Sequence, residues 1–119
     1  GVDIPASIDI STEADENADI AVLAVPSHVM RTVVSRVRFS PRTIRVSVAK
    51  GIENDTLLRM SEVIHVVSGD VPVVCLSGPS HAEEVSHDLP ASLVAAGVDG
   101  AAREVVQEAF MAPALRIYT

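Results

Sequence analysis

Residues 19–26 read Asp-Ile-Ala-Val-Leu-Ala-Val-Pro, and this short apolar run decides the fold class. An almost unbroken row of apolar residues that stops at a proline is typical of a strand buried on both faces. Such strands belong to parallel sheets that are covered by helices. Further strands are predicted at Thr43–Ala49, Val71–Leu76, Ala91–Ala96 and Leu115–Tyr118.

Apolar residues at helical spacing predict helices between these strands. Ser27 is placed to cap the first helix, and Asn54 or Asp55 to cap the second, which Gly69 closes. A short helix at Ser80–Val85 and a longer one at Ala101–Met111 follow. Before the first strand, we expect an edge strand at Ser7–Ile10 and a single helical turn at Thr12–Asn17. The alternation of strands and helices predicts an α/β fold: a partial Rossmann-like, doubly wound parallel sheet with right-handed β-α-β units.

Composition excludes several classes of protein. The formal net charge is -7 and aromatic residues make up 3 % of the chain, so nucleic-acid binding is not expected. The single cysteine, Cys75, excludes an internal disulfide and a thiolate zinc site. No apolar stretch is long enough to span a membrane, and the start of the chain does not resemble a signal peptide. The expected location is the cytoplasm.

The ends of three predicted strands carry unusual residues, at 24–27, 49–53 and 77–84. Ligands of open α/β sheets bind beyond the carboxyl ends of the strands, so we expect these segments to lie side by side along one ligand-binding rim. Lys50 has two interpretations: its ammonium group enters the crevice, or it is a surface lysine that extends from the end of a strand.

The third strand end also has two interpretations. Ser80 and Glu83 fit a capping box, which would satisfy free amides of the short helix. A helix N-terminus on the rim would also bind anionic or polar oxygens. His81 is interpreted as a packing or orienting residue. No spacing typical of a metal site or of a Ser-His-Asp triad is present, and neither is the glycine-rich G-x-G-x-x-G fingerprint of a dinucleotide site.

Three segments together resemble the bacterial-type NAD(P)-dependent glycerol-3-phosphate dehydrogenases. They are Ala-Asp-Ile-Ala-Val-Leu-Ala-Val-Pro-Ser at 18–27, Ala-Lys-Gly-Ile-Glu at 49–53, and Leu-Ser-Gly-Pro-Ser-His-Ala-Glu-Glu-Val at 76–85. Leu89-Pro90 and the segment 115–119 also match in order and spacing, so the resemblance covers nearly the whole chain.

The resemblance implies an oxidoreductase that interconverts dihydroxyacetone phosphate and sn-glycerol 3-phosphate with NAD or NADP, for glycerophospholipid synthesis. It implies that Lys50 contacts both substrate and cofactor. It also implies that Gly78 and Ser80 line the substrate pocket and that Ala82 lies against the dinucleotide. The proton-donating lysine of the family belongs to a later helical domain, so no catalytic residue is expected in this chain.

The resemblance also implies that residues 1–119 are the C-terminal half of an N-terminal NAD(P)-binding domain. The glycine-rich first βαβ unit and the helical substrate domain would lie outside the chain. We therefore expect the chain to be inactive alone and its sheet to have an unpaired edge that favours self-association. The complete protein is expected to be a homodimer.

Two other interpretations stay open from the residues. One is a related enzyme, such as a β-hydroxyacid dehydrogenase or a ketopantoate reductase, which shares the strand ending in Val-Pro. The other is a flavodoxin-like binding domain without catalysis, which should be complete and stable alone.

Overall fold

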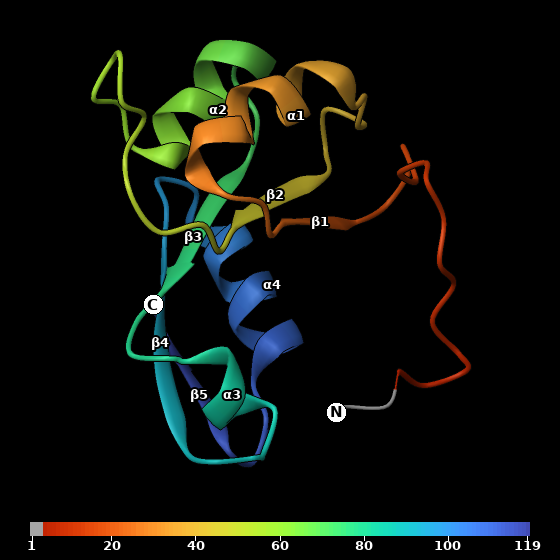
Figure 1. Cartoon of the computed structure of the whole chain (residues 1–119), viewed down its shortest axis with the longest axis vertical. Coiled ribbons are helices and arrows are strands. Elements are labelled where there is room, and N and C mark those ends of the chain that lie inside the picture. Colours follow the sequence, from red (N-terminus) through yellow and green to blue (C-terminus); the bar gives the residue numbers. More distant parts are fainter. Residues whose placement is uncertain (1–3) are drawn as a thin grey trace.

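A computed structural model describes residues 4–119, and predictions that concern Gly1–Asp3 lie outside it. Five strands form one sheet in the order β1-β2-β3-β4-β5 (Figure 1). Their bounds are β1 Ile20–Leu23, β2 Ile44–Ser47, β3 Val73–Ser77, β4 Ala91–Ala96 and β5 Leu115–Tyr118. All five lie within or beside the predicted segments, and the predicted α/β fold class is confirmed.

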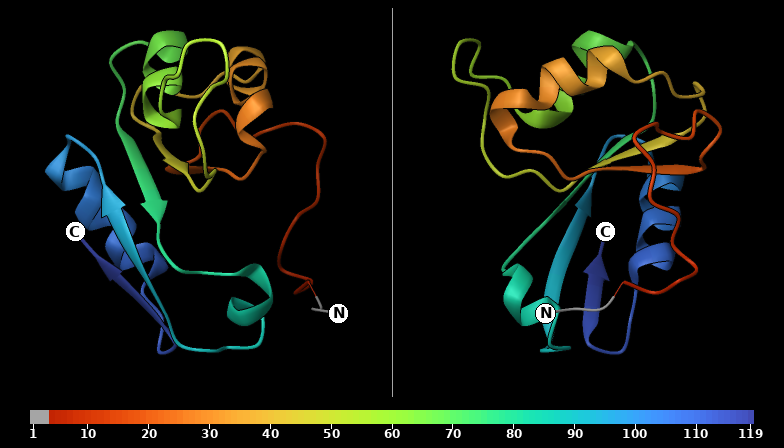
Figure 2. Two further views of the ribbon diagram at one scale, coloured as in Figure 1. Left: turned by 60° about the vertical axis from the view of Figure 1, so that its left-hand side comes forward. Right: turned by 45° about the vertical axis from the view of Figure 1, so that its right-hand side comes forward.

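Helices cover both faces of the sheet (Figures 1 and 2). On one face, α1 (Met30–Arg36) and α2 (Met60–Ser68) pack against each other and against β1 and β3. On the other face, α4 (Gly100–Phe110) packs against β3, β4 and β5. Each face therefore has its own hydrophobic core, one around Met30 and Ile64 and one around Val74 and Val106, all four of them fully buried.

Two strands, β4 and β5, run against the predicted direction. β1, β2 and β3 pair in parallel, as do β4 and β5, but β4 is antiparallel to β3. A parallel crossover needs a connection that packs back over the sheet, usually an α-helix. The connection between β3 and β4 contains only the four-residue helix α3 (Ala82–Val85), and none of its residues is buried. The chain therefore turns back after α3 instead of crossing the sheet (Figure 2).

Two glycines mark the two ends of the β3–β4 pair. A Cβ atom on Gly78 would lie 2.6 Å from the carbonyl oxygen of Ser92, and one on Gly97 would lie 2.6 Å from that of Val73. Both distances are too short for any real side chain, so the close approach of the two strands requires glycine at both positions.

The helix starts differ from the predicted ones. Ser27 begins a 3-10 turn (Ser27–Val29) and makes no capping hydrogen bond to α1. α2 begins at Met60, so neither Asn54 nor Asp55 is its cap. Instead, Arg59 is the N-cap, and its amide donates to Glu62 Oε2 at 2.8 Å. The residues from 53 to 58 form a turn in place of helix, with the Leu57 amide donating to the Glu53 carbonyl.

The segment before β1 contains turns and no strand or helix in its described part, residues 4–19, so the predictions at Ser7–Ile10 and Thr12–Asn17 are wrong. Ile8 and Ile10 are 56 % and 84 % exposed, because no second layer covers them. The end of α2 agrees with its prediction, because Gly69 is the C-cap at φ 79°.

Substitution of Gly78 by alanine should destabilise the fold, because the added methyl group meets the β4 backbone and cannot be accommodated by a rotamer change. We expect a loss of about 1–3 kcal/mol in the free energy of unfolding, the range for overpacking. Gly100→Ala is the matched control, since its Cβ would meet only the tip of Arg103 at 3.7 Å. Urea unfolding of the two variants checks this, and equal effects would contradict the steric argument.

The edge of β1 should drive self-association of the 119-residue chain. Within the described residues β1 pairs only with β2, so the backbone groups on its other side are free to pair with a second chain. Val22 on β1 is 45 % exposed. We expect sedimentation velocity to detect oligomers that Val22→Lys reduces and that Val98→Lys, at a 98 % exposed position off the sheet, leaves unchanged. A chain that stays monomeric at all concentrations would refute this expectation.

Candidate functional site

The parallel pairing of β1, β2 and β3 brings the carboxyl ends of three strands to one edge of the sheet. β1 leads into Pro26-Ser27, β2 leads into Lys50-Gly51, and β3 leads into Gly78. This is the predicted rim, and the sheet order places its three segments in neighbouring positions.

The first two segments of the rim are in contact. Gly51 has a φ of 107°, which L side chains rarely adopt, and a Cβ atom there would lie 3.3 Å from the Ser27 hydroxyl oxygen. The tight turn after β2 thus packs directly on the turn after β1. Gly51 supplies both the backbone conformation and the space.

Lys50 is exposed at this rim and forms no ion pair with any carboxylate of residues 4–119. It is also the only lysine in the chain. Its ammonium group is therefore available to a ligand, and no salt bridge would have to break before it binds an anion.

A bidentate ion pair holds the segment that follows Lys50. Arg31 on α1 donates from Nε to Glu53 Oε1 at 2.8 Å and from Nη2 to Glu53 Oε2 at 2.7 Å. The Thr56 hydroxyl also donates to Glu53 Oε2. The hydrogen bonds from Arg31 are the main cause that lowers the pKa of Glu53 from 4.5 to about 2. Sequence reasoning missed Arg31, because its partner is 22 residues away and no local spacing links them.

The third segment of the rim makes fewer contacts than the first two. Gly78 is half-buried beside β4, whereas Ala82 and His81 are exposed. The Ser80 hydroxyl makes only a long bond, 3.5 Å, to the Gly78 carbonyl. The predicted capping box of Ser80 and Glu83 is wrong, because His81 is the N-cap of α3 and no side chain caps this helix. Ser80 precedes α3 and Ala82 begins it, in the connection that leads from β3 to β4 (Figure 2).

Two polar side chains of β2, those of Arg45 and Ser47, are buried. Arg45 on β2 donates to the Thr43 carbonyl at 2.8 Å and lies over the Phe39 ring, and burial lowers its pKa. The Ser47 hydroxyl is buried and has no hydrogen-bond partner among the described residues. Neither was predicted, since both lie inside a strand that the pattern marks only as apolar.

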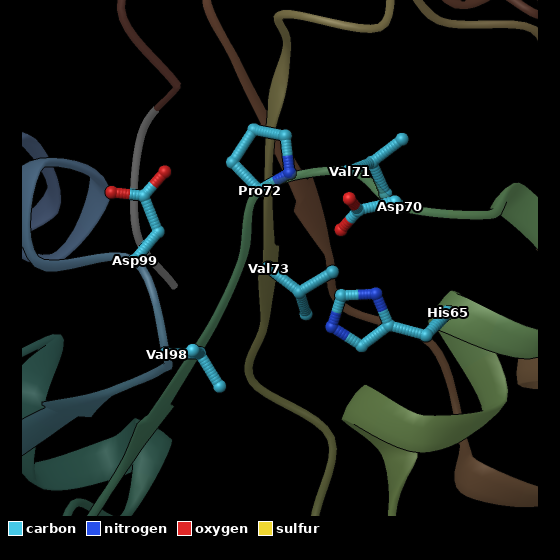
Figure 3. A pocket seen from close by; sticks show the side chains of 7 residues that line it. All are labelled: His65, Asp70, Val71, Pro72, Val73, Val98 and Asp99. Atoms are coloured by element: carbon cyan, nitrogen blue, oxygen red, sulfur yellow. The ribbon is translucent and has the colours of Figure 1, made fainter.

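A cavity of about 290 Å³ lies elsewhere, between the end of α2 and the start of β3 (Figure 3). His65, Asp70 and Asp99 line it together with Val71, Pro72, Val73 and Val98. Because it lies at the amino end of β3, it is separate from the rim that holds Lys50.

Within residues 4–119, no group of three or more His, Cys, Asp or Glu side chains is placed to hold a metal ion. Among the helices described, none has the length and apolar character needed to cross a bilayer.

Comparison with known proteins gives consistent results. Residues 1–110 match the family described as NAD-dependent glycerol-3-phosphate dehydrogenase N-terminus. The chain is 48 % identical to a glycerol-3-phosphate dehydrogenase [NAD(P)+] of Thermoanaerobacter sp. strain X514, with 98 % of the chain and 37 % of the relative covered. It is 41 % identical to the protein of the same name from Desulfitobacterium hafniense strain Y51, with 100 % and 35 % covered.

Among solved structures, the chain is similar to glycerol-3-phosphate dehydrogenase from Coxiella burnetii, with a TM-score of 0.78 and 25 % identity. The match covers 84 % of this chain and 31 % of that one. The chain thus spans little more than a third of the length of the curated relatives it matches.

The Arg31–Glu53 pair should make stability depend on pH in acid. Because the folded-state pKa of Glu53 is depressed to about 2, its contribution is fully present above its ordinary pKa of 4.5 and is lost as pH falls toward 2. We expect Glu53→Gln to lower the free energy of unfolding at pH 7. The difference in this free energy between wild type and variant should decrease as the pH falls from 4.5 to 2. Urea unfolding at several pH values measures this difference, and one that stays constant down to pH 2 would contradict the assigned pKa shift.

Proposed function

Because this chain belongs to the NAD-dependent glycerol-3-phosphate dehydrogenase family, we propose that it is part of an enzyme that interconverts dihydroxyacetone phosphate and sn-glycerol 3-phosphate with NAD or NADP. The observation that carries the proposal is an unpaired lysine at the carboxyl-end rim of a sheet in a chain of this family. The names of the relatives favour this reaction over that of a β-hydroxyacid dehydrogenase or a ketopantoate reductase.

The role proposed for Lys50 is electrostatic. Substrate and cofactor both carry phosphate groups, and the chain itself has a formal net charge of -7, so a local cation is needed to bring the two anions together. An exposed ammonium group in the segment that follows β2 supplies that cation at the rim. Lys50 would thus contact both the substrate and the dinucleotide.

The remaining site residues are proposed with narrower roles. Gly78 and Ser80 would line the substrate pocket, and Ala82 would lie against the dinucleotide. When bound, the reduced nicotinamide supplies the hydride for the ketone carbon. The chain lacks the glycine-rich fingerprint that holds a pyrophosphate, and a lysine outside this chain would protonate the alkoxide oxygen.

The family match and the share of the relatives' length that the chain covers support a domain assignment. We propose that residues 1–119 are the C-terminal half of an N-terminal NAD(P)-binding domain in a cytoplasmic, homodimeric enzyme of glycerophospholipid synthesis. The 119-residue chain would be inactive alone. An assay of dihydroxyacetone phosphate reduction, following the loss of reduced nicotinamide, should detect activity in the full open reading frame only. Activity of the short chain would overturn this assignment of the catalytic groups.

In the complete enzyme, Lys50→Ala should lower kcat/KM. Removing one charged donor from an active site costs on the order of 2–4 kcal/mol of transition-state stabilisation, or roughly 30- to 1000-fold. Because Lys50 is exposed, the melting temperature should not change. Steady-state kinetics and thermal unfolding on the same preparation check both statements. Unchanged kcat/KM would remove Lys50 from the proposed site.

A further inference from the structure

We propose that Arg31 is a positioning residue for this site: by clamping Glu53 from α1, it fixes the turn that carries Lys50. The inference rests on the function proposed above for Lys50. It adds to the site a residue that touches neither substrate nor cofactor and acts only through the geometry of the loop.

The clamp joins a buried helix to a turn whose residues are mostly exposed. Met30, next to Arg31, is fully buried, and Val34 one turn later is 6 % exposed, so α1 is held firmly against α2. By contrast, the residues of the turn are exposed on both sides of Glu53, at 50–52 and 54–57. Glu53 is the exception, with a side chain only 15 % exposed.

Glu53 also organises the turn around itself. Its amide donates to the Leu58 carbonyl at 2.9 Å, and its carbonyl accepts from the Leu57 amide at 2.8 Å. Its carboxylate accepts from Arg31 and from Thr56. A bidentate guanidinium–carboxylate pair fixes direction as well as distance, so the carboxylate has one orientation relative to α1.

The clamp is close enough to Lys50 to control its place. Three residues of chain span at most about 10–11 Å, and the intervening Gly51 holds a φ of 107° against Ser27. Lys50 is therefore held from two sides, by β2 before it and by the clamped Glu53 after it. Release of the Glu53 carboxylate would leave the Gly51–Ser27 contact and the backbone hydrogen bonds within the turn, but no side-chain bond from the turn to α1.

The test is a double-mutant cycle in the full-length enzyme, with kcat/KM for dihydroxyacetone phosphate reduction as the readout. Arg31→Met should lower kcat/KM by about 10- to 100-fold, the range for a reacting group misplaced by roughly 1 Å. In a Lys50→Ala background, the same change should have little further effect, because the group that Arg31 positions is gone. Arg36→Met, which removes an exposed cation from the same helix, is the matched control and should leave kcat/KM unchanged.

A merely structural role for Arg31 predicts a different result, an equal fold loss with and without Lys50. That result, or wild-type kcat/KM in Arg31→Met, would overturn the proposal. If Arg31→Met does not fold, Glu53→Gln replaces it in the same cycle, since it breaks the charged pair from the other side. The Lys50→Ala variant alone distinguishes failure of the proposed function from failure of the positioning role. If this variant has wild-type activity, the proposed function of Lys50 fails. If it is impaired while Arg31→Met and Glu53→Gln are not, only the positioning role fails.

Discussion

The pairing of β2 with β3 is the interaction on which the rest of the structure depends. Val46 and Val74 are opposite each other in this ladder and are both fully buried. Val46, Val74 and Leu76 belong to the α4 core, and Val73 of β3 belongs to the α1–α2 core on the other face. Because the two strands run in parallel, Lys50 and Gly78 leave the sheet at the same edge. The site therefore follows from a packing requirement of the core.

The parts of this fold that the sequence predicts are those fixed by burial. β1, β3 and the α2 face are rows of apolar residues whose period identifies the element, and the Lys50 rim follows once the strands are parallel. The starts of the helices were predicted wrongly at Ser27 and at Asn54 or Asp55. Serine, asparagine and aspartate form several local hydrogen bonds with similar energy, and the sequence does not show which one the folded chain adopts.

Two other features depend on contacts that no local pattern contains. The direction of β4 is set by the short, unburied α3 and by glycines at both ends of its pairing with β3. The Arg31–Glu53 pair joins helix α1 to the turn after β2, and these two segments become neighbours only when β1 and β2 pair. The sequence predicts Lys50 as a candidate ligand-binding residue, and the structure adds the contacts that hold its turn.

The buried Arg45 has a consequence for how the sheet is assembled. Its guanidinium lies on the α1–α2 side of β2, where the Thr43 carbonyl and the Phe39 ring receive it. A slip of β2 by one residue would turn this cation to the opposite side, among Val74, Val106 and Ile117, where no polar atom could accept its protons. The apolar residues on either side of Arg45 would tolerate such a shift far better, since valine and isoleucine fit both cores. One charged side chain thus selects the correct alignment of the strand from several that hydrophobicity alone would permit.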